Sequence, residues 1–474
     1  MSDADFKALL PLVLIAGTAV VSILVIALRR SHAQTATIAL AGLAAAFRSL
    51  WIAADAAPRT IRPLLTVDPY ALFYMGLIFA ASAAFVLLSY DYFTKCEGDH
   101  DEVYVLMLIA TLGAAVLVAS SHLIALFLGL ELLSISLYGM IAYLRTRPLP
   151  LEAGLKYLVL AAVSSAFLLF GIALIYAAMG TMELTRMATM LPGAAFDQRL
   201  VFSGLVLVIT GLGFKLAVVP FHLWTPDVYE GAPAPVTAYI ATVSKGAVFA
   251  ALLRYFQDAR LVAIPSVFLL LSAIAVVSMI AGNLLALLQE NLKRILAYSS
   301  IAHLGYLLVA FLAGGNLAVV AVTFYLAAYF VTTLGAFGVI SVLSNGEKGP
   351  ATIESYRGLF WRRPVLAATF TAMLLSLAGI PMTAGFIAKF YVIAAAASSA
   401  RWTLVLTLVI TSAVGLYYYL RVVVALYTEC ERPSSSETSI AAVPGLLLGV
   451  LMSLLLWFGV FPGALLRLIR EVVS

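Results

Sequence analysis

The sequence carries little charge for its length. Of its 474 residues, 64% are hydrophobic and only 11% are Asp, Glu, Lys or Arg, and its mean hydropathy is +1.07. An ordinary soluble domain carries roughly 25% charged residues, so that class is excluded. A helix that spans a bilayer takes about 20 apolar residues, which leaves room here for about 14 such helices. The composition therefore predicts an all-α polytopic membrane protein.

Cysteine and basic runs are also scarce. The two cysteines, Cys96 and Cys430, form no C-x-x-C motif, so we expect inert thiols and neither an iron–sulfur cluster, a haem nor a metal site in this chain. The net charge of +5 is scattered, and no basic run is long enough to follow a nucleic acid backbone. The N-terminus is acidic and lacks a cleavage motif, which indicates an uncleaved first span rather than a signal peptide.

Long apolar stretches predict about fourteen spans. An even number places both termini on one side of the membrane. Slightly more Lys and Arg fall in the loops of the opposite face, so we expect the termini outside, on the periplasmic side. The predicted spans cover residues 8–28, 34–54, 69–91, 102–120, 122–145, 152–179, 200–219, 234–257, 261–288, 291–314, 316–344, 364–398, 402–427 and 439–463.

Two of these spans contain helix breakers in their interior. The seventh runs into Pro220, and the twelfth contains Gly379, Pro381 and Gly385. Free backbone groups at membrane depth are tolerated only inside protein or beside water, so paired broken helices indicate a transport pathway. Their spacing predicts two inverted five-helix repeats. The expected organisation is three N-terminal spans in 1–100, repeats in 101–258 and 259–430, and a last span in 431–474.

Four charged residues lie well inside predicted spans: Glu131, Lys215, Lys245 and Lys389. A charge at the centre of a span costs about 2.5 to 3.5 kcal/mol on insertion, so each must face the protein interior or a hydrated cavity. Lys215 precedes the Pro220 break, and Lys389 follows the Pro381 break as its counterpart. We therefore interpret these four as functional residues.

Weaker candidates accompany them. Lys156 lies near the start of its span and His222 follows Pro220, while Tyr298 and His303 lie on the tenth span. Amines, imidazoles and phenols relay protons through water, whereas sodium prefers a cluster of oxygen ligands, so protons are the favoured cargo. Burial disfavours a charged lysine and a nearby carboxylate favours it. An approach of Glu131 to Lys215 could thus switch proton release toward Lys245.

Three motifs carry a family resemblance. They are residues 130–136 (LELLSIS), 213–235 (GFKLAVVPFHLWTPDVYEGAPAP) and 292–305 (LKRILAYSSIAHLG). They resemble the antiporter-like membrane subunits of respiratory complex I, which share them with multi-subunit cation/proton antiporters. The match extends over almost the whole chain. Lys389, together with an end at Ser474 that leaves no long lateral helix, favours the N-type member, subunit 2 of mitochondria.

The resemblance implies proton translocation within NADH:quinone oxidoreductase. Glu131 would pair with Lys215, Lys245 would be the central relay and Lys389 the terminal group, with Lys156, His222, Tyr298 and His303 in support. It also implies that NADH, FMN, iron–sulfur clusters and quinone belong to partner subunits. The M-type and small membrane subunits would be neighbours in a bacterial plasma membrane. Two alternatives stay open: an Mrp-type cation/proton antiporter without redox partners, and an inert scaffold.

Overall fold

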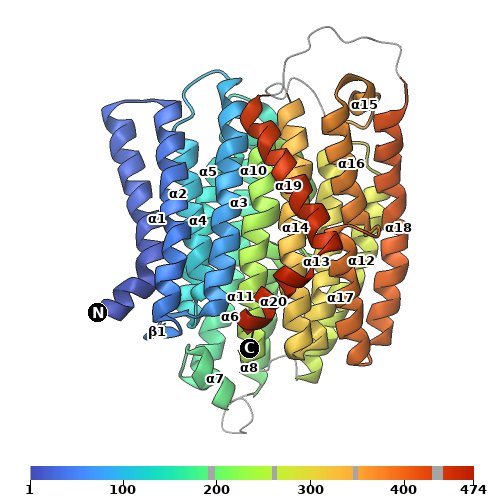
Figure 1. Ribbon diagram of the computed structural model, residues 1–474. Coiled ribbons are helices and arrows are strands. Elements are labelled where there is room, and N and C mark those ends of the chain that lie inside the picture. Colours follow the sequence, from blue (N-terminus) through green and yellow to red (C-terminus); the bar gives the residue numbers. More distant parts are fainter. Residues whose placement is uncertain (1, 191–197, 259–263, 345–350, 430–440, 474) are drawn as a thin grey trace.

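The computed structural model describes residues 2–190, 198–258, 264–344, 351–429 and 441–473. Within these ranges the chain is almost entirely helical, and its long helices stand side by side in one bundle (Figure 1). Thirteen helices of the described chain are long and apolar enough to cross a membrane. The predicted all-α polytopic membrane fold is confirmed.

The first half of the described chain contains α1 (Asp3–Leu28), α2 (His32–Ala56), β1 (Arg59–Ile61), β2 (Leu65–Val67), α3 (Pro69–Thr94), α4 (Glu102–Ala119), α5 (Leu123–Ile141), α6 (Pro148–Met179), α7 (Leu184–Met190), α8 (Gln198–Leu216), α9 (Trp224–Gly231), α10 (Ala234–Tyr239), a π-helical turn (Ile240–Ser244) and α11 (Lys245–Asp258). The second half contains α12 (Pro265–Leu287), α13 (Leu292–Ala313), α14 (Gly315–Leu343), a 3₁₀ turn (Glu354–Tyr356), α15 (Leu359–Arg362), α16 (Pro364–Ala378), α17 (Ala384–Ser398), α18 (Trp402–Tyr427), α19 (Ala442–Val460) and α20 (Gly463–Val473).

Both predicted helix breaks are present. The seventh span ends as α8 at Leu216, and the chain turns before the short helix α9 begins at Trp224. The twelfth span is divided into α16 and α17, which are separated by residues 379–383. Together with the thirteen long helices, this divided span accounts for the fourteen that the sequence predicts. The inverted repeat and its boundaries stay a prediction.

Several short elements differ from the prediction. The loop before α3 forms an antiparallel hairpin in which Thr60 lies opposite Thr66. The helix α20 packs its buried Leu466 and Ile469 toward α3 and α14 and leaves Arg467 exposed. Because α20 has only 11 residues, it is too short to span a bilayer. These elements are missed because short amphipathic and hairpin segments give no long apolar run.

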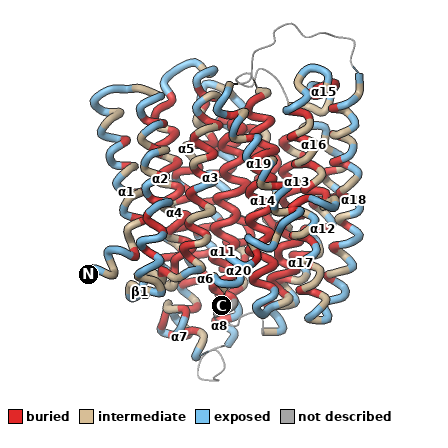
Figure 2. The backbone as a smooth tube through the Cα atoms, in the orientation of Figure 1, coloured by how far each residue is buried: buried red, intermediate tan, exposed pale blue. Residues whose placement is uncertain are grey.

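The centre of the bundle consists of α10, α11, α13 and α14. These helices are buried along almost their whole length, whereas α1, α18 and α19 expose most of their surface (Figure 2). Apolar side chains cover the exposed faces of the outer helices, as expected of helices that contact lipid. The intramembrane charges are therefore best sought on the buried central helices and on the sides of the helices that touch them.

Candidate functional site

The acidic end of the site lies between α5 and α6. Glu131 is half-buried in the middle of α5, and its carboxylate accepts a hydrogen bond from the Ser165 hydroxyl of α6. One turn after Glu131 on the same helix face, Ser134 is buried. Ser134 in turn accepts a hydrogen bond from Lys215, at 2.6 Å. Glu131 and Lys215 thus bind different serines, Ser165 and Ser134, and no ion pair within 4.0 Å joins the two among the described residues.

Lys215 occupies the last turn of α8, directly before the helix break. Its side chain is 3% exposed, and its ammonium lies 5.8 Å from the centre of the Tyr157 ring. The carbonyl groups in the last turn of a helix have no helical donors and carry partial negative charge, which stabilises a cation placed there. The break thus gives Lys215 a favourable environment without a direct carboxylate.

Lys245 begins α11, directly after the π-helical turn at Ile240–Ser244. Its side chain is 2% exposed, and its ammonium donates to Ser300 of α13 at 2.6 Å. The rings of Tyr229 and Trp224 lie 5.1 Å and 5.9 Å from the nitrogen, close enough for cation–π attraction. Single π turns inside α-helices often occur at functional sites. Lys245 therefore combines deep burial with an irregular backbone.

A cluster of hydroxyl and imidazole groups continues from Lys245 along α13. His303 lies one turn after Ser299, and both residues hydrogen-bond the Tyr419 hydroxyl of α18. The other ring nitrogen of His303 lies 2.6 Å from the Tyr325 hydroxyl of α14. The predicted shared face of Ser299 and His303 is therefore confirmed. Each of these groups can both give and accept a proton, so the cluster can serve as a relay.

Lys389 lies at the far end of this series, in α17. It is 8% exposed and donates to the Ser412 hydroxyl at 2.8 Å and to the carbonyl oxygens of Leu377 and Ala378 at 2.9 and 2.8 Å. In an unbroken helix, Leu377 would accept from the residue four positions on, which is Pro381 and has no N–H. The helix break thus frees the carbonyls that bind the ammonium.

The two halves of the series differ in what separates their charged groups. Between Lys215 and Lys245 lie three aromatic rings, those of Tyr157, Phe214 and Trp224, with centres 4.9 to 6.2 Å apart. Between Lys245 and Lys389 lie the serine, tyrosine and histidine groups of α13, α14 and α18. The faces of aromatic rings thus separate Lys215 from Lys245, whereas hydrogen-bonded hydroxyl and imidazole groups lie between Lys245 and Lys389.

Three predicted residues lie outside this series. Lys156 forms ion pairs with Glu152 and Asp227 at the end of the bundle, where its side chain is 43% exposed. His222 lies in the turn between α8 and α9, half-buried, and its Nδ1 atom has no hydrogen-bond partner among the described residues. Tyr298 is half-buried against apolar side chains of the core. The structure does not bring these three side chains to the buried lysines.

The ion pairs of Lys156 belong to a larger network. Arg294 of α13 contacts Asp227 and Glu230 of α9, each at 2.9 Å. Burial opposes the charged form of Asp227, but hydrogen bonds from Lys156 and Arg294 outweigh it and hold the pKa of that carboxyl below its ordinary value. The network thus joins α6, α9 and α13 at one end of the bundle.

Sequence reasoning missed several buried polar residues. Lys293 is almost wholly buried and donates to the carbonyls of Glu230 and Ala232, at 3.2 and 2.9 Å. A charge near the start of a span gives no sequence signal that it is buried. Ser300 and Ser412 each bind one of the lysines. Within an apolar run, a single serine gives no signal that distinguishes it from ordinary packing.

The described residues contain no group of three or more His, Cys, Asp and Glu side chains suited to hold a metal ion. The site is instead a series of buried amines, one carboxylate, hydroxyl groups and one imidazole inside a polytopic membrane protein. This arrangement defines a membrane protein with a charged axis of a kind suited to proton transfer.

The family of the chain follows from comparison with known proteins. Residues 120–415 match the model of the NADH:quinone oxidoreductase/Mrp antiporter transmembrane family, and the chain belongs to this family. A chain of respiratory complex I from Thermus thermophilus is 34% identical, with a TM-score of 0.82, over 96% of this chain and 98% of that one.

Two further structures are similar. A chain of the membrane-bound sulfane sulfur reductase, an archaeal respiratory membrane complex, is 26% identical with a TM-score of 0.86, over 98% of this chain and 97% of that one. A chain of the Mrp complex from a Dietzia species is 19% identical with a TM-score of 0.86, over 99% of this chain and 97% of that one, which shows a common fold. The predicted resemblance to the antiporter-like membrane subunits is therefore confirmed.

Proposed function

We propose that this chain is the N-type antiporter-like subunit of a proton-translocating NADH:quinone oxidoreductase. Within the family, the 34% identity to a complex I chain from Thermus thermophilus supports a complex I role over an Mrp-type one. In this proposal FMN, iron–sulfur clusters and quinone are carried by partner subunits, and the neighbours include the M-type and small membrane subunits. The chain lies in a bacterial inner membrane with both termini on the periplasmic side.

The observation that carries the transport role is the series of buried charges. Glu131, Lys215, Lys245 and Lys389 lie on α5, α8, α11 and α17, and each lysine donates to a serine of a neighbouring helix. Burial of an amine makes its charged form costly, so its proton can be released when the surrounding charges or waters move. His303 and its tyrosine partners supply proton-exchanging groups between Lys245 and Lys389.

The proposed mechanism uses Glu131 as the group that changes first. A shift of its carboxylate away from Ser165 and toward Lys215 would favour the charged lysine, and its return would favour proton release toward Lys245. The aromatic rings of Tyr157, Phe214 and Trp224 keep Lys215 and Lys245 apart until water enters or a side chain moves. Such a barrier prevents a passive leak while the charges are at rest.

Co-purification tests the assembly. The chain, tagged and extracted in mild detergent, should purify together with FMN, iron–sulfur absorbance and NADH:quinone activity. Purification without redox partners, combined with proton-for-cation exchange in vesicles, would replace the proposal with an Mrp-type antiporter.

Substitution of the central lysines tests the mechanism. In complexes assembled at the normal level, Lys215→Ala and Lys245→Ala should each lower NADH-driven proton pumping by roughly tenfold or more, because a relay group is lost. Lys7→Ala is the matched control, since Lys7 is an exposed lysine paired with Asp3 on α1. Full proton yield in both central variants would rule out the proposed relay and leave an inert scaffold.

A further inference from the structure

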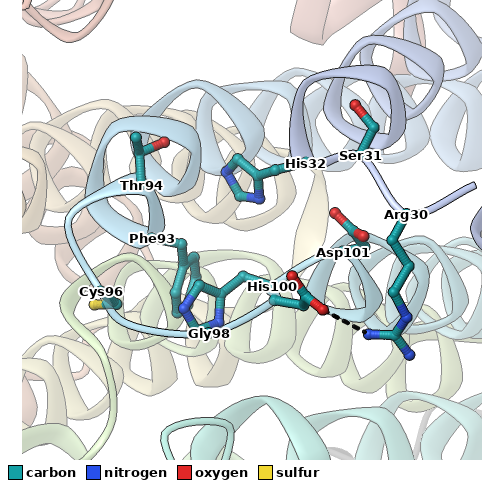
Figure 3. A pocket seen from close by; sticks show the side chains of 10 residues that line it. Arg30, Ser31, His32, Phe93, Thr94, Cys96, Gly98, His100 and Asp101 are labelled. Carbon is teal, nitrogen blue, oxygen red and sulfur yellow. Dashed lines mark ion pairs between the residues drawn. The ribbon is translucent and has the colours of Figure 1, made fainter.

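A second cluster of titratable residues lies apart from the lysine series, at the end of the bundle where α1 turns into α2 and α3 turns into α4. It surrounds a cavity of about 160 Å³ (Figure 3). The cavity is lined by residues 30–32 on one side and by residues of 93–101 on the other. This volume has room for several water molecules, provided that polar groups are present to bind them.

Two histidines supply such groups. His100 is 7% exposed, and both of its ring nitrogens are buried without a hydrogen-bond partner among the described residues. His32 faces the cavity from α2, and its Nδ1 atom likewise has no partner in the described chain. Buried ring nitrogens are costly when they make no hydrogen bond. Water in the adjoining cavity is the partner that the geometry provides.

The charge around the cavity is unbalanced. Arg30, at the exposed rim, pairs with Glu102 at 2.8 Å and with Asp99 at 3.5 Å, the latter pair dashed in Figure 3. Asp101 is only 2% exposed, and no described cation lies within ion-pair distance of its carboxylate. Burial raises the pKa of Asp101, and the neighbouring Glu102 and Asp99 add to this, while His32 and Arg30 oppose it.

Every element around the cavity contributes titratable or charged groups, and their sum favours a cation. Four carboxylates, those of Glu97, Asp99, Asp101 and Glu102, are set against the one guanidinium of Arg30 while the histidines are neutral. The Asp91–Lys95 pair at the end of α3 adds no net charge. The complete set is Arg30 from α1, His32 from α2, Tyr90, Asp91 and Lys95 at the end of α3, Cys96, Glu97, Asp99 and His100 from the linker, Asp101, Glu102 and Tyr104 around the start of α4, and Tyr143 after α5.

We propose that this cavity is a hydrated proton-binding site, in which His100, His32 and Asp101 share an excess proton with enclosed water molecules. Imidazole nitrogens and a carboxylate line the cavity, and these groups take up and release protons, so the proton is the cation that their chemistry fits. The exposed Arg30 and Asp99 at the rim connect the cavity to the aqueous phase.

The inner wall of the site leads into the protein. The Tyr104 hydroxyl of α4 lies 3.1 Å from Nε2 of His32. Two turns further along α4, Thr111 contacts Ser82 of α3 and Tyr239 of α10, each at 2.9 Å. This polar series points toward the span that carries Lys245. A role for this series as a proton route to the lysines rests on the proposed function. The proton-binding site does not, because its proton uptake can be measured in the absence of enzyme turnover.

Nitrogen-15 solid-state NMR of the full chain in bilayers tests the site. The five histidines are labelled and assigned with single His→Gln variants. The spectra are recorded between about pH 8 and pH 5, the range around neutral pH in which imidazole groups act as switches, and we expect the ring nitrogens of His100 to report uptake of a proton by the cluster. We also expect water-edited spectra to show magnetisation transfer from water to His100. A His100 that keeps one protonation state across this range, or that shows no water transfer, would overturn the proposal.

Charge variants show whether the cluster acts as one site. Asp101→Asn should lower the midpoint of the pH-dependent change seen at His100, because it removes a neighbouring carboxylate that favours a bound proton. Asp99→Asn lies at the exposed rim, where folding is not at risk, and should shift the midpoint in the same direction by less. Asp55→Asn, exposed at the opposite end of α2, is the matched control and should not shift it. An unchanged midpoint in both cluster variants would contradict a shared proton site.

Discussion

Each of the three buried lysines of the site donates to one serine hydroxyl, and none of them forms a direct ion pair within the described chain. A directly paired carboxylate would stabilise the charged lysine and keep its proton bound. A serine hydroxyl can accept a hydrogen bond from the ammonium and can also form a hydrogen bond with the neutral amine. A neutral hydrogen-bond partner therefore keeps both protonation states accessible. In this respect the three lysines differ from Arg254, which forms a direct ion pair with Asp68.

The Lys245–Ser300 contact gives a residue-scale prediction. Ser300→Ala leaves the buried ammonium without its hydroxyl partner, and we expect it to lower the free energy of unfolding by about 1 to 3 kcal/mol. In the Lys245→Met background the same serine substitution should cost less, because no amine is left unsatisfied. Unfolding by a denaturing detergent, measured for both single variants and the double variant, gives the coupling. Equal costs in both backgrounds would show that the contact contributes nothing.

At this scale the sequence predicts the charges but not their partners. Glu131, Lys215, Lys245 and Lys389 stand out because a charge inside an apolar run is costly and has few structural explanations. Their serine partners, by contrast, lie on other helices, Ser134 and Ser300 far along the chain and Ser412 on the next helix, and serine is common in membrane helices. Glu131 and Lys215 bind different serines, Ser165 and Ser134, and the sequence does not predict this, because side-chain contacts depend on packing that no periodicity encodes.

At the scale of elements, the broken helices explain how two of the lysines are held. Lys215 lies at the C-terminal end of α8, and Lys389 binds carbonyls at the C-terminal end of α16. Both lysines thus meet the negative end of an interrupted helix. The proline and glycine residues that cause the breaks are visible in the sequence, so this feature is predictable. The π turn before Lys245 is not, since no residue type specifies it.

Gly385 gives the element-scale prediction. It lies in the first turn of α17, its N–H donates to the Ser376 hydroxyl, and a Cβ at this position would meet the Ser376 carbonyl oxygen of α16 far inside contact distance. Gly385→Ala should therefore force the two half-helices apart and destabilise the protein by about 1 to 3 kcal/mol. Thermal unfolding in detergent measures this effect.

Gly449→Ala is the matched control for this substitution. Gly449 lies in the membrane helix α19, and a Cβ there would have no heavy atom of another helix or side chain within 4 Å in the described chain. We expect it to leave the unfolding temperature unchanged or to raise it slightly, since alanine favours a helix over glycine. If both glycine variants unfold alike, the close approach of α16 and α17 does not contribute to stability.

At the scale of the whole molecule, ion pairs tie together parts of the chain that are distant in sequence. Arg254 of α11 makes two hydrogen bonds to Asp68, which also caps the start of α3, and this joins the eighth span to the N-terminal spans. At the other end of the bundle, Lys156, Asp227 and Arg294 join α6, α9 and α13. The number of spans follows from hydropathy, but these links do not, because they join loops and helix ends whose spatial order the sequence leaves open.

The Asp227 network gives a prediction on pH. The pKa of Asp227 in the folded protein lies below its ordinary value near 4, so its ionised form contributes stability above that pH, and the contribution is lost as the pH falls below it. Because the partners are partly exposed, we expect Asp227→Asn to cost only about 0.5 to 1 kcal/mol at neutral pH. The difference in unfolding temperature between the two proteins should shrink as the pH falls below the ordinary carboxyl range near 4, because Asp227 then takes up a proton.

High salt should also reduce this difference at neutral pH, since partly exposed charges are screened. Asp55→Asn is again the control, because Asp55 is exposed at the opposite end of α2 and should show no dependence on either condition. A difference that stays the same at low and neutral pH would mean that Asp227 acts through packing or hydrogen bonds rather than through its charge. The connection between α6, α9 and α13 would then be a steric one, and protonation of Asp227 would not loosen the contacts among these three helices.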